Sequence, residues 1–356
     1  MAEDSGRIEG PLDRMLVDQR HRPLRDLRIS VTDRCNFRCG YCMPKDIFGK
    51  GYAFLKSKEL LSYEEISTLV GIFSHLGVSK IRLTGGEPLL RKDLEKLIRR
   101  ISVLEGIDDI ALTTNASLLT PDRADSLKQA GISRVNISLD ALSPQIYQQI
   151  NQIPYPMEDI LNGVDAALNA GFETVKINMV VQRDINVDDI VKMSEYFRGT
   201  GAILRFIEFM DVGNYNQWSL DKVFSAKEIV ALIHQHYPLE PLKENYTGEV
   251  AKRWRYVDGQ GEIGVISSIT QPFCGDCARA RLSAIGELYT CLFASQGHDL
   301  RALLRQGGTS GQELMQIITN IWQGRSDQYS MERSAQQGSP GVRVNVPKVE
   351  MSYIGG

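Results

Sequence analysis

The amino-acid sequence predicts an α/β fold built on a mainly parallel sheet. Six short runs rich in β-branched residues alternate along the chain with segments whose apolar residues recur at helical spacing. Successive runs begin roughly 25 to 50 residues apart, which leaves room for one right-handed crossover between parallel strands. Six such units predict an open sheet or a partly closed barrel, with the functional site on the loops at the carboxyl ends of the strands.

The expected helices carry their own end signals. Ser62 and Glu65 match a capping box at the start of the first helix, and Gly77 is placed to end it in the left-handed conformation. Pro121 suits the first turn of a later helix, which Gly131 ends. The six expected strands are residues 27–31, 80–84, 109–114, 134–139, 174–181 and 203–209.

The alternation stops near residue 212. Beyond it we expect a loop, a helix in "AKEIVALIHQHYPL", a hairpin that turns at "DGQGE" and a further helix in "GQELMQIITNIWQG". The expected organisation is an N-terminal arm (1–23), a core of βα units (24–235) and a C-terminal region (236–356).

Composition narrows the class of protein. The chain has 356 residues, of which 42% are hydrophobic and 24% charged, as in a water-soluble globular protein. Its net charge of −3 provides no general basic surface, so nucleic-acid binding is not expected and any anion must be recognised locally. We expect a cytoplasmic protein without membrane contact, because no signal-peptide pattern and no apolar stretch near eighteen residues is present.

Half of the cysteines lie in the stretch "DRCNFRCGYCMP". Cys35, Cys39 and Cys42 follow the first expected strand and can wrap one face of an iron–sulfur cube, leaving one iron of a [4Fe–4S] cluster open. The alternatives are a structural zinc site or buried cysteines without metal. Zinc prefers four ligands, and the nearest histidines are His21 and His75. The polar surroundings also disfavour inert core cysteines, so we favour the cluster.

The other three cysteines, Cys274, Cys277 and Cys291, form a second set that is also one ligand short of a full cluster. A second open iron suits a substrate-binding site better than an electron relay. Arg279 and Arg281 follow directly in "RAR" and share one face if the segment is extended. Two guanidiniums beside a metal centre suit a polyphosphate, although an ordinary solvated basic strand is the simpler alternative.

The first cysteine set, with Tyr41 before its last member, resembles that of the radical S-adenosylmethionine (SAM) superfamily. The segment "TGGEPLL" at 84–90 resembles the glycine-rich SAM segment of the same superfamily. The resemblance implies a partial (β/α)6 TIM-like barrel in which SAM binds the open iron of the first cluster. The SAM contacts that it implies are Tyr41, Gly86, Ser138 and Met210, although Ser138 could instead cap a turn and Met210 fill the core.

The second cysteine set and the segments "RVNISLDAL", "RFIEFMDVGN", "GEVAKRW" and "MSYIGG" resemble the GTP 3′,8-cyclase family of molybdenum cofactor biosynthesis over nearly the whole chain. The resemblance implies a C-terminal extension with a second [4Fe–4S] cluster that takes guanine. It implies GTP contacts from Arg28, Arg82, Thr113, Lys176, Arg279, Ala280 and Arg281, with Lys80 as a further cation, and catalytic roles for Arg205, Gly355 and Gly356.

One departure from the family pattern lies in "TTNA" at 113–116, where the family more often has glycine in the fourth place. Ala116 tolerates a positive φ less well than glycine, so we expect this loop to run differently. The expected contact of Thr113 then has Thr114 as a near substitute.

The resemblance also implies the reaction and its partners. A 5′-deoxyadenosyl radical made from SAM abstracts hydrogen from C3′ of GTP, and the sugar radical attacks C8 of guanine. A flavodoxin- or ferredoxin-like protein supplies the electron, and the product passes to cyclic pyranopterin monophosphate synthase. The oligomeric state is left open between a monomer and a homodimer.

Two other functions compete with this one. A radical SAM peptide-modifying enzyme also uses auxiliary clusters, but such proteins usually carry a longer tail that is richer in cysteine. A non-catalytic zinc or RNA-binding module built on "KRWRY" and "RAR" would bind zinc and would not turn over SAM.

Overall fold

The computed structural model describes residues 15–246, 248–306, 308–336 and 347–355. Its centre is one curved sheet with the spatial order β12-β11-β10-β1-β2-β3-β4-β5-β6-β9-β8-β7. The strands are β1 (Asp26–Ser30), β2 (Lys80–Thr84), β3 (Asp109–Thr114), β4 (Arg134–Ser138), β5 (Thr174–Val181), β6 (Ile203–Glu208), β7 (Leu239–Leu242), β8 (Lys252–Tyr256), β9 (Glu262–Ile266), β10 (Arg279–Leu282), β11 (Glu287–Tyr289) and β12 (His298–Asp299).

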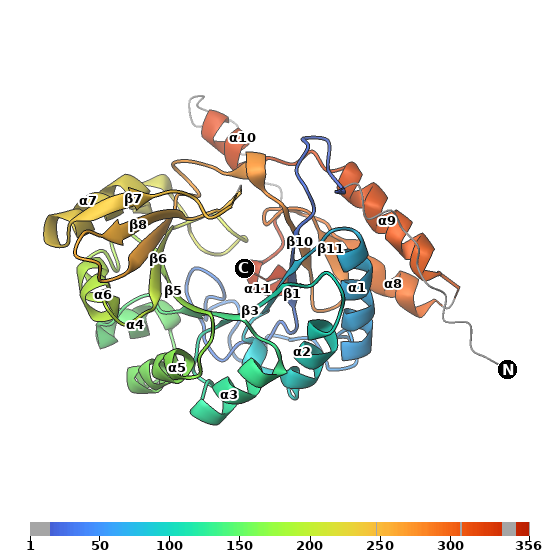
Figure 1. Ribbon diagram of the computed structural model, residues 1–356, viewed down its shortest axis with the longest axis horizontal. Coiled ribbons are helices and arrows are strands. Elements are labelled where there is room, and N and C mark those ends of the chain that lie inside the picture. The colour runs from blue at the N-terminus through green and yellow to red at the C-terminus, as the bar shows by residue number, and fades with distance from the viewer. Residues whose placement is uncertain (1–14, 247, 307, 337–346, 356) are drawn as a thin grey trace.

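Strands β1 to β6 pair in parallel in chain order, which confirms the predicted α/β fold and its partial (β/α)6 barrel. Helices cover the outside of the curve, and the C-terminal end of the chain lies near its centre (Figure 1). The helices are α1 (Tyr63–His75), α2 (Leu94–Ser102), α3 (Pro121–Ala130), α4 (Pro144–Asn151), α5 (Met157–Asn169), α6 (Asp189–Phe197), α7 (Ala226–His236), α8 (Leu300–Arg305), α9 (Gly311–Gln323), α10 (Tyr329–Gln336) and α11 (Met351–Ile354).

The helix-capping signals and the expected strands are present in the structure. Ser62 and Glu65 form both hydrogen bonds of a capping box at α1, and Gly77 beyond its end has a φ of +98°. Strands β2, β3 and β5 have the predicted bounds, whereas β1 begins and ends one residue early and β4 and β6 each end one residue early. These one-residue differences leave every strand in the predicted place.

The region beyond residue 212 extends the same sheet at both edges. Strand β9 pairs in parallel with β6 and carries the antiparallel strands β8 and β7, so the hairpin predicted at "DGQGE" is confirmed. Strand β10 pairs in parallel with β1 and carries the antiparallel strands β11 and β12. Edge strands that would otherwise be open to solvent are thereby paired.

The core lies between the convex side of the sheet and the helices. Along β5, buried and half-buried residues alternate over the whole strand, so one face packs on helices and the other faces the inside of the curve. In the described ranges, no helix combines the length and the apolar character that crossing a bilayer requires.

A buried carboxylate joins the six-strand core to the following region. Glu208 at the end of β6 is fully buried. One oxygen accepts from the Ala226 backbone N–H (2.7 Å) and the Thr270 hydroxyl (2.6 Å), and the other accepts from the backbone N–H groups of Ile269 (2.8 Å) and Thr270 (2.9 Å). This single side chain therefore holds the start of α7 and the loop after β9 against the end of β6.

Replacing Glu208 with Gln should lower the free energy of unfolding by about 3 kcal/mol, because an amide NH2 group would then face backbone donors that need acceptors. Urea unfolding followed by tryptophan fluorescence measures the change. Glu240→Gln is the control, since Glu240 pairs with Arg255 at the surface and should cost less than about 1 kcal/mol. Equal small effects of both substitutions would contradict this role of Glu208.

Candidate active site

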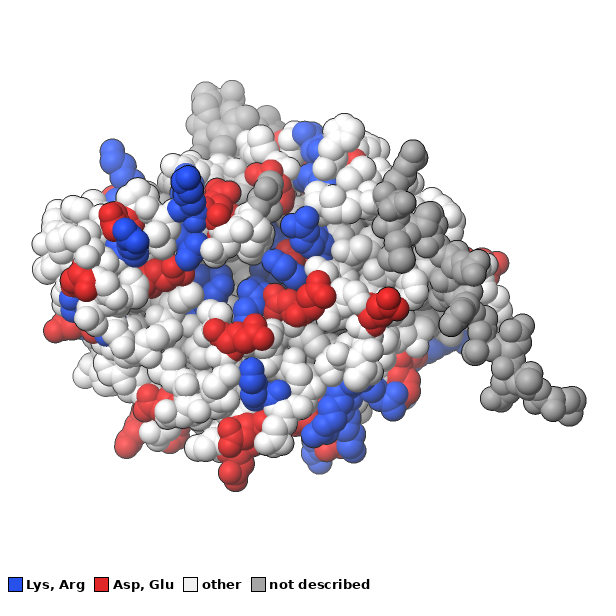
Figure 2. Space-filling model, in the orientation of Figure 1, with Lys and Arg blue, Asp and Glu red and all other residues white. Residues whose placement is uncertain are grey.

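A cavity of about 280 Å³ lies inside the curve of the sheet. On the face shown in Figure 2 the centre of the molecule is hollowed, and Lys and Arg side chains gather in the hollow. The lining comes from β1 to β6, β9 and β10, from the loops at their ends, and from segments before β1, before β8 and after β11. The cavity therefore brings together residues that lie more than three hundred positions apart in the chain.

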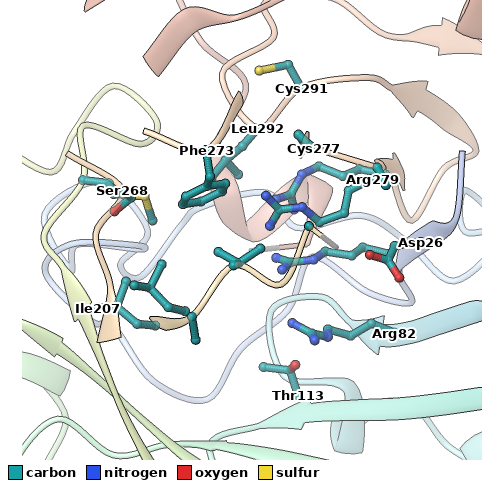
Figure 3. A pocket seen from close by; sticks show the side chains of 18 of the residues that line it. Asp26, Arg82, Thr113, Ile207, Ser268, Phe273, Cys277, Arg279, Cys291 and Leu292 are labelled. Carbon is teal, nitrogen blue, oxygen red and sulfur yellow. The ribbon is translucent and has the colours of Figure 1, made fainter. Parts of the chain in front are cut away.

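The register of the strands sets a row of cations across the cavity. Arg281 on β10 lies opposite Arg28 on β1, which lies opposite Arg82 on β2. Arg82 lies opposite Ala111 on β3, which in turn lies opposite Arg134 on β4. Because paired residues in a sheet point to the same face, all four cationic side chains project into the cavity. Figure 3 shows Arg82 and Arg279 reaching into it from neighbouring parts of the sheet.

Two more cations continue the arrangement on the next strands. Lys176 on β5 lies opposite Asn136, and Arg205 on β6 lies opposite Asn178. Arg205 donates to the side-chain oxygens of Asn178 (3.0 Å) and Asn136 (3.4 Å), which orient it without neutralising its charge. Lys80 and Arg279 line the cavity two residues before Arg82 and Arg281 on their strands.

Burial and mutual repulsion weaken the protonation of these groups. Burial, followed by the charges of neighbouring arginines, lowers the pKa of Arg205 and of Arg281 to about 9 and that of Arg82 to about 10. The same two causes lower the pKa of Lys176 to about 7 and that of Arg28 well below its usual value. A polyanion in the cavity would relieve this repulsion, so the site is built for one.

The first cysteine set lies on the loop after β1, at the carboxyl edge of the sheet. Cys35, Cys39 and Cys42 are half-buried, and the described cysteines form no disulfide. Burial raises the pKa of the Cys35 thiol to about 12 and those of Cys39 and Cys42 well above their usual value. Thiols in this setting become thiolates when a metal takes the proton's place, and three of them on one loop fit a face of an iron–sulfur cube.

The glycines of "TGGEPLL" serve the packing of two loops. The Gly86 N–H donates to the Thr32 carbonyl (2.8 Å) and the Glu87 N–H donates to the Arg34 carbonyl (2.7 Å). A Cβ at Gly86 would overlap the Arg34 carbonyl, and one at Gly85, where φ is +150°, would overlap that of Thr32. Gly86, expected to contact SAM, is not among the residues that line the cavity.

The buried carboxylate of Glu87 joins this segment to the loop after β3. It accepts from the Thr114 hydroxyl (2.7 Å) and the Asn115 backbone N–H (2.7 Å), and burial raises its pKa to about 7. Thr114 is thus occupied, whereas Thr113 lines the cavity and its buried hydroxyl has no hydrogen-bond partner among the described residues. Ala116 adopts a φ of +62°, the conformation that glycine accepts more easily.

Three of the four residues expected to contact SAM line the cavity: Tyr41, Ser138 and Met210. The Tyr41 hydroxyl donates to Asp140 (2.8 Å), whose other oxygen accepts from the Val180 backbone N–H (2.8 Å). Burial raises the pKa of Asp140 to about 6. Asp140 was not predicted from the sequence, although it stands two residues after Ser138 at the end of the same strand.

The second cysteine set lines the same cavity from the opposite side. Cys274 and Cys277 flank a short 3₁₀ turn (Cys274–Asp276), and Cys291 follows β11. Burial opposes ionisation of Cys277, but the charges of Arg279 and Arg325 lower its pKa to about 6. Among the described residues, no three His, Cys, Asp or Glu side chains lie close enough to hold a single metal ion. The donor set of three thiols fits a cluster face, as at the first site.

The described end of the chain packs on β1, β2 and β10. Gly355 has a φ of +74°, a Cβ there would overlap Thr84, and its carbonyl accepts a hydrogen bond from Arg281. Gly356 falls outside the described residues. Ala280 is buried in the core, since it alternates with Arg279 and Arg281 along β10, and its side chain does not line the cavity.

Sequence reasoning missed several cavity residues. Arg134 is the first residue of β4, as Lys80 is of β2, so a basic residue at the start of an expected strand was an available signal. Arg134 pairs with Asp109 through two hydrogen bonds. Tyr246 and Glu249 come from the loop between β7 and β8, with Lys80 Nζ lying 3.7 Å from the centre of the Tyr246 ring. No local pattern places that loop over the cavity.

Family models and solved structures that match this chain agree with the fold described above. A family model for the radical SAM superfamily matches residues 29–197, and one for molybdenum cofactor synthesis (C-terminal) matches residues 202–331. The SuiB structure from Streptococcus suis with bound S-adenosylmethionine has a TM-score of 0.60 at 13% identity, and the match covers 88% of this chain and 68% of SuiB. That likeness shows the fold alone.

Relatives in sequence are far closer. A GTP 3′,8-cyclase of Acidothermus cellulolyticus is 50% identical over 95% of this chain and 98% of its own length. One of Xanthomonas campestris pv. campestris (strain B100) is 50% identical over 96% and 97%, and one of Staphylococcus epidermidis is 46% identical over 96% and 99%. On this identity and coverage, the chain belongs to the GTP 3′,8-cyclase family.

Proposed function

We propose that this chain converts GTP to (8S)-3′,8-cyclo-7,8-dihydroguanosine 5′-triphosphate with SAM and a reductant, the first step of molybdenum cofactor biosynthesis. The observation that supports this most is the in-register row of Arg281, Arg28 and Arg82 in a cavity lined by cysteines of the second set and by residues next to the first. Guanidiniums in a row can grip a polyphosphate through paired hydrogen bonds. The reaction itself is inferred from membership of the GTP 3′,8-cyclase family.

In this proposal Cys35, Cys39 and Cys42 hold a [4Fe–4S] cluster together with SAM. The bound pair supplies a carbon radical that can take a hydrogen atom from C3′ of GTP. Tyr41, Ser138 and Met210 hold SAM, and Gly86 serves it through its carbonyl, because its N–H already donates to Thr32. This chain's own task is to place SAM against C3′ and to exclude other hydrogen donors.

At the other end of the cavity, Cys274, Cys277 and Cys291 hold a second [4Fe–4S] cluster that takes the guanine. The triphosphate contacts Arg28, Arg82, Arg279 and Arg281, with Lys176 and Thr113 nearby, and Ala280 contributes through its backbone. Two separated anchors on one nucleotide fix its direction as well as its position. A directed, tightly held C3′ is what selective hydrogen abstraction requires.

Arg205, Gly355 and Gly356 are proposed to act at the reacting centre. Arg205 lines the cavity, is half-buried and is held by two amide oxygens, so its charge is fixed in position at the reacting centre. The Gly355 carbonyl accepts from Arg281, so the chain end and the triphosphate meet at the same guanidinium.

The competing peptide-modifying function has some support from the fold, because a SuiB structure with a bound precursor peptide has a TM-score of 0.60 with this chain. At 12% identity, that structural likeness does not show that this chain shares the peptide substrate. The cation row favours the nucleotide, since a peptide does not need a row of neighbouring positive charges inside a cavity.

Several further features belong to the proposal. A flavodoxin- or ferredoxin-like donor would supply the electron, and cyclic pyranopterin monophosphate synthase would take the product. A cytoplasmic location suits six unpaired cysteines, which need a reducing compartment. We retain the division into an arm (1–23), a radical SAM core (24–235) and a substrate-side region (236–356).

The central test is anaerobic incubation of reconstituted protein with GTP, SAM and dithionite. 5′-Deoxyadenosine should form in step with a cyclised nucleotide, and ATP in place of GTP should give no cyclised product. Liquid chromatography with mass detection measures both products. Equal 5′-deoxyadenosine formation with a peptide mixture and no nucleotide would contradict the proposed function.

Removing Gly355 and Gly356 should abolish the cyclised product, because the Arg281 guanidinium loses the Gly355 carbonyl that links it to the tail. Iron and sulfide per chain should stay unchanged, since no cysteine lies in the tail. Product formation and iron content are measured on the same preparations. Full cyclisation by the shortened chain would rule out this role.

Binding of the triphosphate should take up a proton through Lys176. With its pKa lowered to about 7, the free side chain is mostly neutral at pH 8, and a nearby polyanion raises that pKa and restores the charge. Calorimetric titration with GTP in two buffers of different ionisation enthalpy should show uptake of up to about one proton at pH 8 and much less at pH 6. Lys176→Met should lose the uptake, whereas Lys192→Met, at an exposed site, should keep it. If Lys176→Met took up the same number of protons on binding GTP, the uptake would belong to another group.

A further inference from the structure

Two buried arginines hold the turn that carries the second cysteine set. Arg22, from the arm before β1, donates through Nη1 to the carbonyls of Cys274 (2.8 Å) and Asp327 (2.8 Å). Arg325, which follows α9, donates through Nη1 to the carbonyl of Cys277 (2.6 Å). Each arginine side chain is only 1% exposed. The two cysteine carbonyls are thus fixed by segments about 250 and 50 residues away in the chain.

One carboxylate couples the two arginines. Asp18, whose side chain is fully buried, lies 2.6 Å from Arg22 Nε and 3.5 Å from Arg325 Nη1 through the same oxygen. Its other oxygen accepts from the backbone N–H groups of Arg20 and Arg22 (2.9 Å each). The Trp322 indole N–H donates to the Arg22 carbonyl (3.2 Å), and the Arg325 guanidinium lies 4.6 Å from that ring. Asp18, Arg22 and Arg325 therefore form one rigid unit, called the arginine clamp below.

The clamp also faces the cavity. Arg22 and Arg325 line it together with Cys274 and Cys277. Arg22 Nη2 is buried and has no hydrogen-bond partner among the described residues; a carboxylate oxygen of Asp327 lies 4.0 Å away. A buried guanidinium N–H without an acceptor is costly, and the sulfur of a bound cluster is an acceptor of the required kind. If the arginine clamp served only to join the N-terminal arm to the segment after α9, the Arg22 guanidinium would not need to line the cavity.

The first cysteine set is held in a related manner by its own loop. Arg38 donates through Nη1 to the carbonyls of Cys35 (2.7 Å) and Phe37 (2.7 Å), and through Nε to that of Phe48 (2.6 Å). Both sets therefore use a guanidinium on a cysteine carbonyl. The difference is that the first support is local in sequence, whereas the second comes from the two distant segments.

We propose that Asp18, Arg22 and Arg325 are positioning residues for the second cysteine set, and that they hold Cys274 and Cys277 in the arrangement that binds the second cluster. The proposal rests on the proposed function for the identity of that cluster. Guanidinium is suited to this task because its planar fork donates in several fixed directions, so one side chain can hold two carbonyls and a carboxylate. The N-terminal arm is then part of the second metal centre.

The test compares Arg22→Gln, Arg325→Gln and Asp18→Asn with Arg20→Gln. Arg20 lies on the same arm and donates to the Ser326 carbonyl at the surface, without contact to a cysteine, which makes it a matched control. After anaerobic reconstitution, iron should fall from about eight per chain to about four in the three clamp variants and stay at about eight in the control. The electron paramagnetic resonance signal of the first cluster, which shifts on addition of SAM, should remain in all four.

A second measurement does not need a cluster. In metal-free protein, alkylation of Cys274 and Cys277 by iodoacetamide, followed peptide by peptide, should become about tenfold faster in the clamp variants. Cys35 and Cys39 should keep their rates. Arg22→Lys, which retains the charge beside Asp18 but not the fork, should lie between the wild type and Arg22→Gln in both measurements.

The outcomes separate the two proposals. Unchanged iron and unchanged alkylation in the clamp variants would overturn the clamp, as would equal losses at both cysteine sets in every clamp variant, including Arg22→Lys. About four irons in the wild type would overturn the second cluster of the proposed function, and the alkylation rates of metal-free protein would still decide for or against the clamp.

Discussion

The feature on which the rest of this structure depends is a row of positive charges inside a parallel sheet. Arg281, Arg28 and Arg82 stand in register on three neighbouring strands, in a chain whose net charge is −3. Burial and mutual repulsion lower the pKa of each of them. Folding tolerates this row of neighbouring positive charges because the opposite face of the same strands is apolar and packs on helices. The cavity thereby concentrates positive charges whose mutual repulsion a bound polyanion would relieve.

The two cysteine sets are held in shape by different supports. Backbone hydrogen bonds join the loop of the first set to the glycine segment after β2. Only glycine at positions 85 and 86 allows the two segments to come this close, because a Cβ at either position would overlap the cysteine loop. The second lies on a turn with little regular structure, and buried arginines from distant segments hold its carbonyls. One set is thus a local motif and the other is assembled by the fold, although both present three thiols.

Much of this arrangement could be predicted from the sequence. The alternation of strand and helix, the caps at Ser62 and Gly77, and the hairpin at "DGQGE" are local signals, and the structure contains all of them. Period two placed Arg279 and Arg281 on one face, and both line the cavity. The choice between Thr113 and Thr114 could not be made, because it depends on which hydroxyl Glu87 accepts from across the loops.

The sequence by itself determined the fold class, the two sets of three cysteines and the place of the first set after a strand, because each of these depends on spacings of a few residues. Only the tertiary structure decided that Arg134 joins the row, that the glycine segment packs on the cysteine loop, and that Arg22 reaches the second set. These contacts join residues 20 to 250 positions apart, and pairing register and burial, which no local pattern encodes, bring them together.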